Sequence, residues 1–126
     1  MWRLLFESYR HLIRIGILMR TDLGMASIHT LVRSQAMVQS KETATLHPGT
    51  LCHAMDLACV FYPSRILCLQ RSSATTILLR RHGIPAEMVI GARQMQSRFH
   101  AWVEVGGDVA NDKPYVTEIY QELHRC

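Results

Sequence analysis

Residues 68–92 have the sequence CLQRSSATTILLRRHGIPAEMVIGA, which predicts a helix followed directly by a strand. From Leu69 to Arg81 the apolar residues follow helical spacing, and arginines occupy the opposite face. Gly83 suits the left-handed position that ends a helix, and Pro85 prevents the helix from continuing. The segment Glu87–Ala92 is therefore predicted to be a strand.

A hairpin and a terminal helix complete the prediction for the C-terminal half. Phe99–Val105 alternates with the period of a strand, and Gly106-Gly107 turns the chain. We expect Asp108–Asp112 to return as a third strand and Tyr115–Arg125 to form a helix. Helices combined with a small antiparallel sheet give an α+β fold.

The N-terminal half is predicted to be helical. The residues that recur at spacings of three and four in the first helix are Trp2, Leu5, Phe6, Tyr9, Leu12, Ile13 and Ile17. A second helix is expected from about Ser27 to Gln39 and a third over Leu51–Val60, with the polar Ser40–Thr50 as their connection. We expect a single domain over residues 1–126. Residues 1–50 form its helical preface, packed on a core of residues 51–126 that combines the sheet with a cysteine-bearing helix.

Composition excludes several classes of protein. The 126 residues are 48% hydrophobic and 19% charged, which excludes wholesale disorder. The net charge of 14 − 10 = +4 is too small and too scattered to indicate nucleic-acid binding. Arginines interrupt the apolar N-terminus, so neither a membrane span nor a signal peptide is expected. The four cysteines have no C-x-x-C spacing, so we expect no metal site and no disulfides, in a cytoplasmic protein with reduced thiols.

Three residues are candidates for nucleophilic catalysis. A thiol reacts as its thiolate, which the unpaired N–H groups at the start of a helix stabilise, and Cys68 lies at such a start. A nucleophile also needs a base, and the base needs an orienting group on its other nitrogen. His100 in the first hairpin strand and Asp112 at the end of the second are suited to these two roles.

The register of the hairpin decides whether His100 and Asp112 meet. A two-residue loop pairs Val105 with Asp108, which places Asp112 opposite Ala101 and on the wrong face. A three-residue loop over 105–107 instead places Asp112 across from His100, with Gly107 left-handed. The sequence therefore predicts an odd loop or a bulge if Asp112 is to contact His100, and Asn111 would lie on the opposite face.

Several blocks together resemble a known family. They are Cys-Leu-Gln-Arg-Ser (68–72), LLRRHGIPAEMVIG (78–91), His-Ala-Trp-Val-Glu-Val (100–105) and Asn-Asp (111–112). These blocks resemble the lasso-peptide leader peptidases, which are transglutaminase-like, papain-related cysteine peptidases, and the likeness covers about Leu67 to Cys126. It implies a transglutaminase-like core in which Cys68 is the nucleophile, His100 the general base and acid, and Asp112 the orienting group, without a cofactor.

The resemblance also implies partners. Some family members carry a fused leader-recognition domain with strands, but residues 1–50 show no strand signal, so this chain is similar to the stand-alone peptidases. Its implied partners are a precursor peptide, a separate leader-recognition protein and a lasso cyclase resembling asparagine synthetase. The rival functions are another acyl transfer by the same three residues, such as amide formation, and a non-catalytic scaffold for the modifying complex.

The remaining candidates have weaker signals. Trp102, Phe99 and Arg71 are candidates for substrate contact, although Trp102 is better suited to packing under the site and Arg71 to a solvated face. Phe99 stands where the family commonly has a small residue. Cys52 and Cys59 lie seven apart on one helical face and are expected in the core, whereas Cys126 is expected to be a free terminal thiol. The apolar residues of the first 39 positions are either core or a docking patch for the partner.

Overall fold

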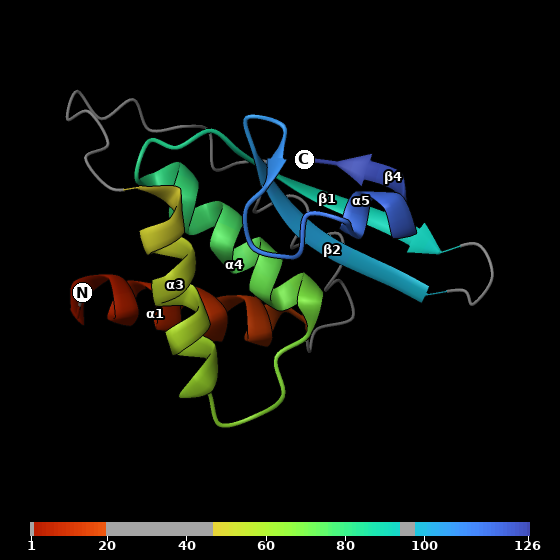
Figure 1. The fold of residues 1–126 in the computed structure, drawn as a ribbon. Helices are drawn as coiled ribbons and strands as arrows, with labels where there is room; N and C mark the ends of the chain where they lie inside the picture. The colour runs from red at the N-terminus through yellow and green to blue at the C-terminus, as the bar shows by residue number, and fades with distance from the viewer. Residues whose placement is uncertain (1, 20–46, 94–97) are drawn as a thin grey trace.

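The computed structural model describes residues 2–19, 47–93 and 98–126, and the predicted helix from about Ser27 to Gln39 lies outside them. The described elements in chain order are α1 (Trp2–Met19), α3 (Pro48–Val60), α4 (Cys68–Arg81), β1 (Ala86–Arg93), β2 (Arg98–Val105), β3 (Asp108–Val109), α5 (Val116–Ile119) and β4 (Gln121–Arg125). Helix α4 packs against α1 and α3 on one side and against β1 and β2 on the other (Figure 1). The predicted α+β class is confirmed.

Helix α4 begins and ends where the sequence predicts. Its first residue is Cys68, and the chain ends the helix at Gly83, whose φ of 78° is left-handed. The Gly83 N–H donates to the Arg80 carbonyl at 3.0 Å, and the Ile84 N–H donates to the Leu79 carbonyl at 3.0 Å. This is the hydrogen-bond pattern with which a glycine closes a helix. The chain then turns directly into β1.

The central helix is buried along most of its length. Leu78 and Leu79 are fully buried and share a core with α1, α3 and the strand residues Met88 and Val103. Four buried hydroxyls lie between them and Cys68, at Ser72, Ser73, Thr75 and Thr76. Three of them donate to the helix backbone four residues earlier, as Ser73 does to the Leu69 carbonyl at 2.6 Å. The exception is Ser72, which bonds outside the helix.

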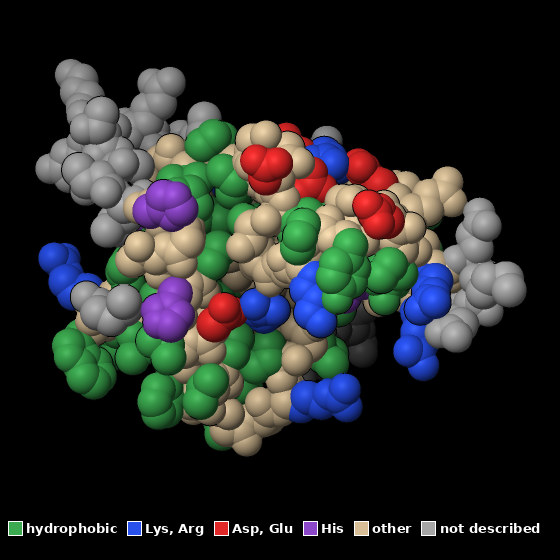
Figure 2. Space-filling model, in the orientation of Figure 1, with side chains coloured by type: hydrophobic (Ala, Val, Ile, Leu, Met, Phe, Trp, Pro, Cys, Tyr) green, Lys and Arg blue, Asp and Glu red, His purple; other side chains and the backbone are tan. Residues whose placement is uncertain are grey.

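The first helix is apolar on two sides. Leu12 and Ile15 are fully buried in the shared core. Trp2 and Phe6 are instead exposed, at 83% and 67%, and hydrophobic side chains gather over the start of α1 and the end of α3 (Figure 2). The N-terminal apolar residues are therefore partly core and partly surface. No helix in residues 2–19, 47–93 and 98–126 combines the length and the apolar character that crossing a membrane requires.

The four strands form one antiparallel sheet in the order β3-β2-β1-β4. Successive residues of a strand face opposite sides, so β2 contributes to two cores. Val103 packs with the helices, whereas Trp102 packs on the other face with Val89 and Val116. His100 is two residues from Trp102 and therefore lies on that second face, away from the main helical core.

The structure decides the register of the hairpin and corrects two predictions for the C-terminal part. The loop of the hairpin has two residues, because Val105 pairs with Asp108 and both intervening glycines have positive φ. The returning strand β3 has only two residues rather than five. The predicted helix over Tyr115–Arg125 is wrong as well, since only α5 is helical and the following residues form β4. Pairing with the open edge of β1 overrides the helical propensity of this segment.

Candidate active site

Cys68 is the exposed cysteine of the chain, and it is the first residue of α4. The residue before it, Leu67, is extended and makes no side-chain cap on the helix. The first N–H groups of a helix have no partner within the helix, so those of α4 remain available around the thiol. The predicted position of Cys68 at a helix start is therefore confirmed, and its surroundings favour an anion.

The structure brings His100 and Asp112 together. His100 Nε2 lies 2.5 Å from Asp112 Oδ2, and each side chain is about one quarter exposed. The second carboxylate oxygen, Oδ1, accepts a hydrogen bond from the Lys113 N–H at 2.7 Å, which fixes the orientation of the carboxylate. Because Nε2 faces Asp112, Nδ1 is the imidazole nitrogen that remains for a reacting group.

Asp112 reaches His100 through an interruption of the ladder after a two-residue loop. Of the two alternatives that the sequence left open, an odd loop or an irregularity in the strand, the odd loop is therefore not the one used. The Ala110 N–H still donates to the Val103 carbonyl at 2.8 Å, as a regular ladder requires. The Val103 N–H, however, donates to the side chain of Asn111, to Oδ1 at 2.7 Å. Asn111 thus replaces the backbone carbonyl that a continued strand would supply. The chain leaves the ladder there, and Asp112 is free to turn toward His100.

The same asparagine connects the hairpin to the cysteine-bearing helix. Asn111 Nδ2 donates to Ser72 Oγ at 3.2 Å, and Ser72 Oγ donates to the Ala101 carbonyl at 2.9 Å. Ser72 lies one helical turn after Cys68 on the same face, and Ala101 follows His100 directly. This buried connection therefore holds the start of α4 beside the part of β2 that carries His100. Ser72 was not predicted to be a site residue, and Asn111 was predicted only to lie on the opposite face from Asp112.

Two aromatic rings pack against the imidazole. The Tyr120 ring stacks on His100 with centroids 5.1 Å apart, and the Trp102 ring stacks at 6.2 Å. Gly91, which pairs with His100 across β1 and β2, makes room for them. A Cβ at Gly91 would lie 2.8 Å from the Trp102 ring and 2.9 Å from the Tyr120 Cβ. Tyr120 was missed because its segment was predicted to be helical.

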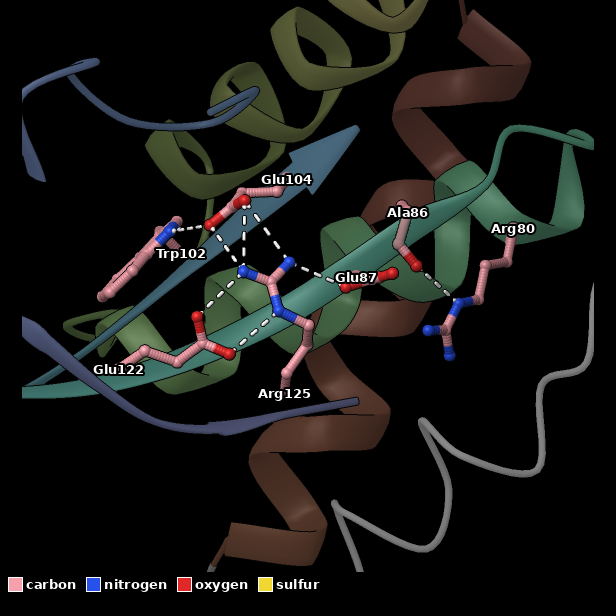
Figure 3. A network of polar contacts seen from close by, with 7 residues as sticks. All are labelled: Arg80, Ala86, Glu87, Trp102, Glu104, Glu122 and Arg125. Atoms are coloured by element: carbon pink, nitrogen blue, oxygen red, sulfur yellow. Dashed lines mark hydrogen bonds and ion pairs between the residues drawn. The ribbon is translucent and has the colours of Figure 1, made fainter. Parts of the chain in front are cut away.

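A charged network supports Trp102 from the far side (Figure 3). The Trp102 indole N–H donates to Glu104 Oε2 at 2.8 Å, and this buried carboxylate also lies 3.3 Å from the guanidinium of Arg125. Arg125 is in β4 and binds Glu87 and Glu122 as well, at 2.7 and 2.9 Å. Trp102, only 1% exposed, is thus a packing residue under the site, and Glu104 is salt-bridged.

The other candidates for substrate contact lie in different surroundings. Phe99 is 68% exposed beside His100 and remains accessible. Arg71 is engaged by Asp56 of α3 at 2.6 Å. Cys52 is buried in the core, and burial raises the pKa of its thiol to about 11. Burial also raises the pKa of the half-buried Cys59. Within residues 2–19, 47–93 and 98–126, no group of His, Cys, Asp and Glu side chains is arranged to hold a metal ion.

Comparison with known proteins agrees with the resemblance seen in the sequence. The model of the transglutaminase-like superfamily matches residues 12–125. The microcin J25-processing protein McjB of Escherichia coli is 47% identical over 47 residues, which are 37% of this chain and 23% of that protein. The matched part thus spans less than a quarter of that relative, and no solved structure matches the chain significantly. Because the family model covers nearly the whole chain, the chain belongs to the transglutaminase-like superfamily.

Proposed function

We propose that the chain is a cysteine peptidase that removes the leader from a lasso-peptide precursor, with Cys68, His100 and Asp112 as its catalytic residues. The observation that carries the proposal is the contact between His100 and Asp112, held beside the start of α4 by Ser72 and Asn111. The superfamily match and the similarity to a microcin J25-processing protein support it.

The proposed reaction has two steps. The Cys68 thiolate attacks the scissile carbonyl, and His100 transfers a proton to the departing amine, which leaves a thioester on Cys68. His100 then activates a water molecule that hydrolyses the thioester. Asp112 holds the ring through Nε2, so Nδ1 faces the thiol in this scheme. The backbone N–H of Cys68, at the start of α4, donates to the oxyanion.

The proposed partners follow from the resemblance of residues 67–126 to the leader peptidases. We propose that the precursor is presented by a separate leader-recognition protein in the cytoplasm, and that a lasso cyclase resembling asparagine synthetase closes the ring afterwards. The relative is named a microcin J25-processing protein, and in this proposal the present chain processes its own precursor together with these partners.

Weighing the products tests this proposal against its rivals. The chain is incubated with a precursor and the leader-binding protein, and the products are identified by mass spectrometry. Hydrolysis gives two fragments whose masses sum to that of the precursor plus one water. The rival acyl transfer by the same three residues gives an adduct with an added amine, and a scaffold leaves the precursor intact. Either of the last two results would overturn the peptidase assignment.

A further inference from the structure

A cavity lies beside the candidate active site, at the end of β1. Its volume is about 490 Å³. It is lined by Ala92 and Arg93 of β1 and by residues 117–121, which run from α5 to the first residue of β4. These elements lie at the end of the sheet away from α1 and α3 (Figure 1). This volume is within the range of pockets that bind small ligands. It is much larger than the space that one water molecule needs.

One residue that lines the cavity also contacts the imidazole of His100. Tyr120 lines it, and the ring of the same tyrosine stacks on His100 at 5.1 Å. Ala92 is one residue beyond Gly91, which pairs directly with His100. By contrast, none of the lining residues belongs to α4, where Cys68 lies. The cavity is therefore on the histidine side of the site and not on the cysteine side.

The chemistry of peptide cleavage separates these two sides. When the thioester forms, the bond between Cys68 Sγ and the carbonyl carbon is made and the carbon–nitrogen bond breaks, and the proton of His100 goes to the departing nitrogen. The acyl segment thus remains at Cys68, whereas the departing nitrogen must lie at His100. The chain that follows this nitrogen therefore starts on the imidazole side of the site, the side on which Tyr120 stacks against the ring.

We propose that this cavity binds the first residues of the peptide segment that departs as the amine, on the C-terminal side of the scissile bond. The inference rests on the proposed function and deepens it. An arginine and a glutamate line the cavity beside a half-buried tyrosine and one partly exposed isoleucine. This mixture suits a short segment with polar groups rather than a bulky apolar side chain. In this proposal the peptidase itself binds the segment that is released as the amine, and the partner protein binds the leader.

The test compares two substrates that share the acyl segment. One is a peptide that extends beyond the scissile bond, and the other is a methyl ester of the same acyl segment, whose small leaving group places nothing in the cavity. Thr117→Trp, at an exposed position of the cavity wall, should lower kcat/KM for the peptide by about tenfold or more and leave the ester unchanged. Val60→Trp, which starts from a side chain of similar shape on the exposed end of α3, should change neither.

A second measurement needs no substitution. The acyl-enzyme formed from the ester is offered either a peptide of the departing segment or the amide of its first residue alone. If the cavity holds the segment, the peptide should capture the acyl group about tenfold better or more. Equal capture, or a parallel loss on both substrates in Thr117→Trp, would overturn the cavity assignment alone. A wild-type chain that forms no acyl-enzyme on Cys68 would overturn the proposed function with it.

Discussion

Helices α3 and α4 both carry cysteines, but they place them in opposite surroundings. Cys52 lies within α3, is 6% exposed and has a pKa that burial raises to about 11. Cys68 is the first residue of α4 and is exposed. A thiol that must lose its proton is disfavoured in the first setting and accessible in the second. Position in the helix, more than the presence of cysteine, therefore separates a packing thiol from a candidate nucleophile.

The starts of the two helices differ in the same sense. At α3 the side chain of His47 accepts the Gly49 N–H at 3.0 Å, and Pro48 has no N–H to leave unpaired. At α4 the corresponding position is Leu67, whose side chain cannot accept a hydrogen bond. The N–H groups around Cys68 are thus left for an anion, such as a thiolate or an oxyanion.

The largest effect expected from this comparison is on catalysis. Cys68→Ala should reduce leader removal by about 10⁴-fold or more, because the nucleophile is lost. Cys52→Ala should instead leave the rate per folded molecule intact and lower the free energy of unfolding by about 1–2 kcal/mol, because it leaves a small cavity. Cleavage assays with urea unfolding on both variants measure the two quantities. Full activity in Cys68→Ala would show that the thiol at the start of α4 is no more important for catalysis than the buried thiol in α3.

Alkylation should separate the thiols without any substitution. At pH 8 a thiol with a pKa of about 11 is thiolate in about one molecule in a thousand, and burial restricts access to Cys52 further. We expect iodoacetamide to label Cys68 first and Cys52 more slowly by about 10²-fold or more. Peptide mapping by mass spectrometry gives the order, and the first adduct should be missing from Cys68→Ala. Labelling of Cys52 at the same rate as Cys68 would contradict the structure.

Sequence reasoning succeeded where local signals and tertiary packing agree. The start of α4 at Cys68 and its end at Gly83 follow from residues within one turn of each boundary. The way in which Asp112 reaches His100 was not predictable from local signals. It depends on the Asn111 side chain, which replaces one backbone hydrogen bond of the ladder. Counting residue pairs along a hairpin assumes that only backbone groups form the ladder, so it cannot predict a side chain in that role.

The failure at β4 has a different origin. All five of its residues are exposed, so burial imposes no period-two alternation on the sequence Gln-Glu-Leu-His-Arg. These residue types favour a helix, and only the open edge of β1 makes the segment a strand. The position of Tyr120 against His100 depends on this pairing, so it was hidden from sequence reasoning too.

Substitution of Asn111 tests whether catalysis depends on the connection between α4 and the hairpin. Asn111→Ala removes the acceptor for the Val103 N–H and the donor to Ser72, so Asp112 loses its fixed position. We expect kcat to fall by about 10²-fold, since small displacements of catalytic groups have effects of this size, with KM nearly unchanged. Asn111→Asp keeps the acceptor for Val103 and should recover part of kcat. A rise in KM alone would indicate a substrate contact instead of a positioning role.

The smallest expected effect concerns the other end of α4. There, as at Cys52 in α3, an ionisable side chain is buried. His11 of α1 is 4% exposed, and its Nε2 has no hydrogen-bond partner among the described residues. Burial, with Arg81 at the end of α4, lowers the pKa of His11 from 6.5 to about 4, and Glu7 opposes this shift only partly. His11 is therefore neutral in the folded chain at pH values where it gains a proton in the unfolded chain.

This difference fixes the sign of the pH dependence. Between pH 6.5 and about 4 the unfolded state binds more protons at His11, so stability is highest above pH 6.5 and falls as the pH is lowered. We expect a loss of about 1–2 kcal/mol in the free energy of unfolding from pH 7 to pH 5. Urea unfolding at the two pH values measures it. His11→Leu should remove most of this loss, whereas His53→Leu, at an exposed position of α3, should retain it. An unchanged acid sensitivity in His11→Leu would show that a different group couples protonation to the packing of α1 against α4.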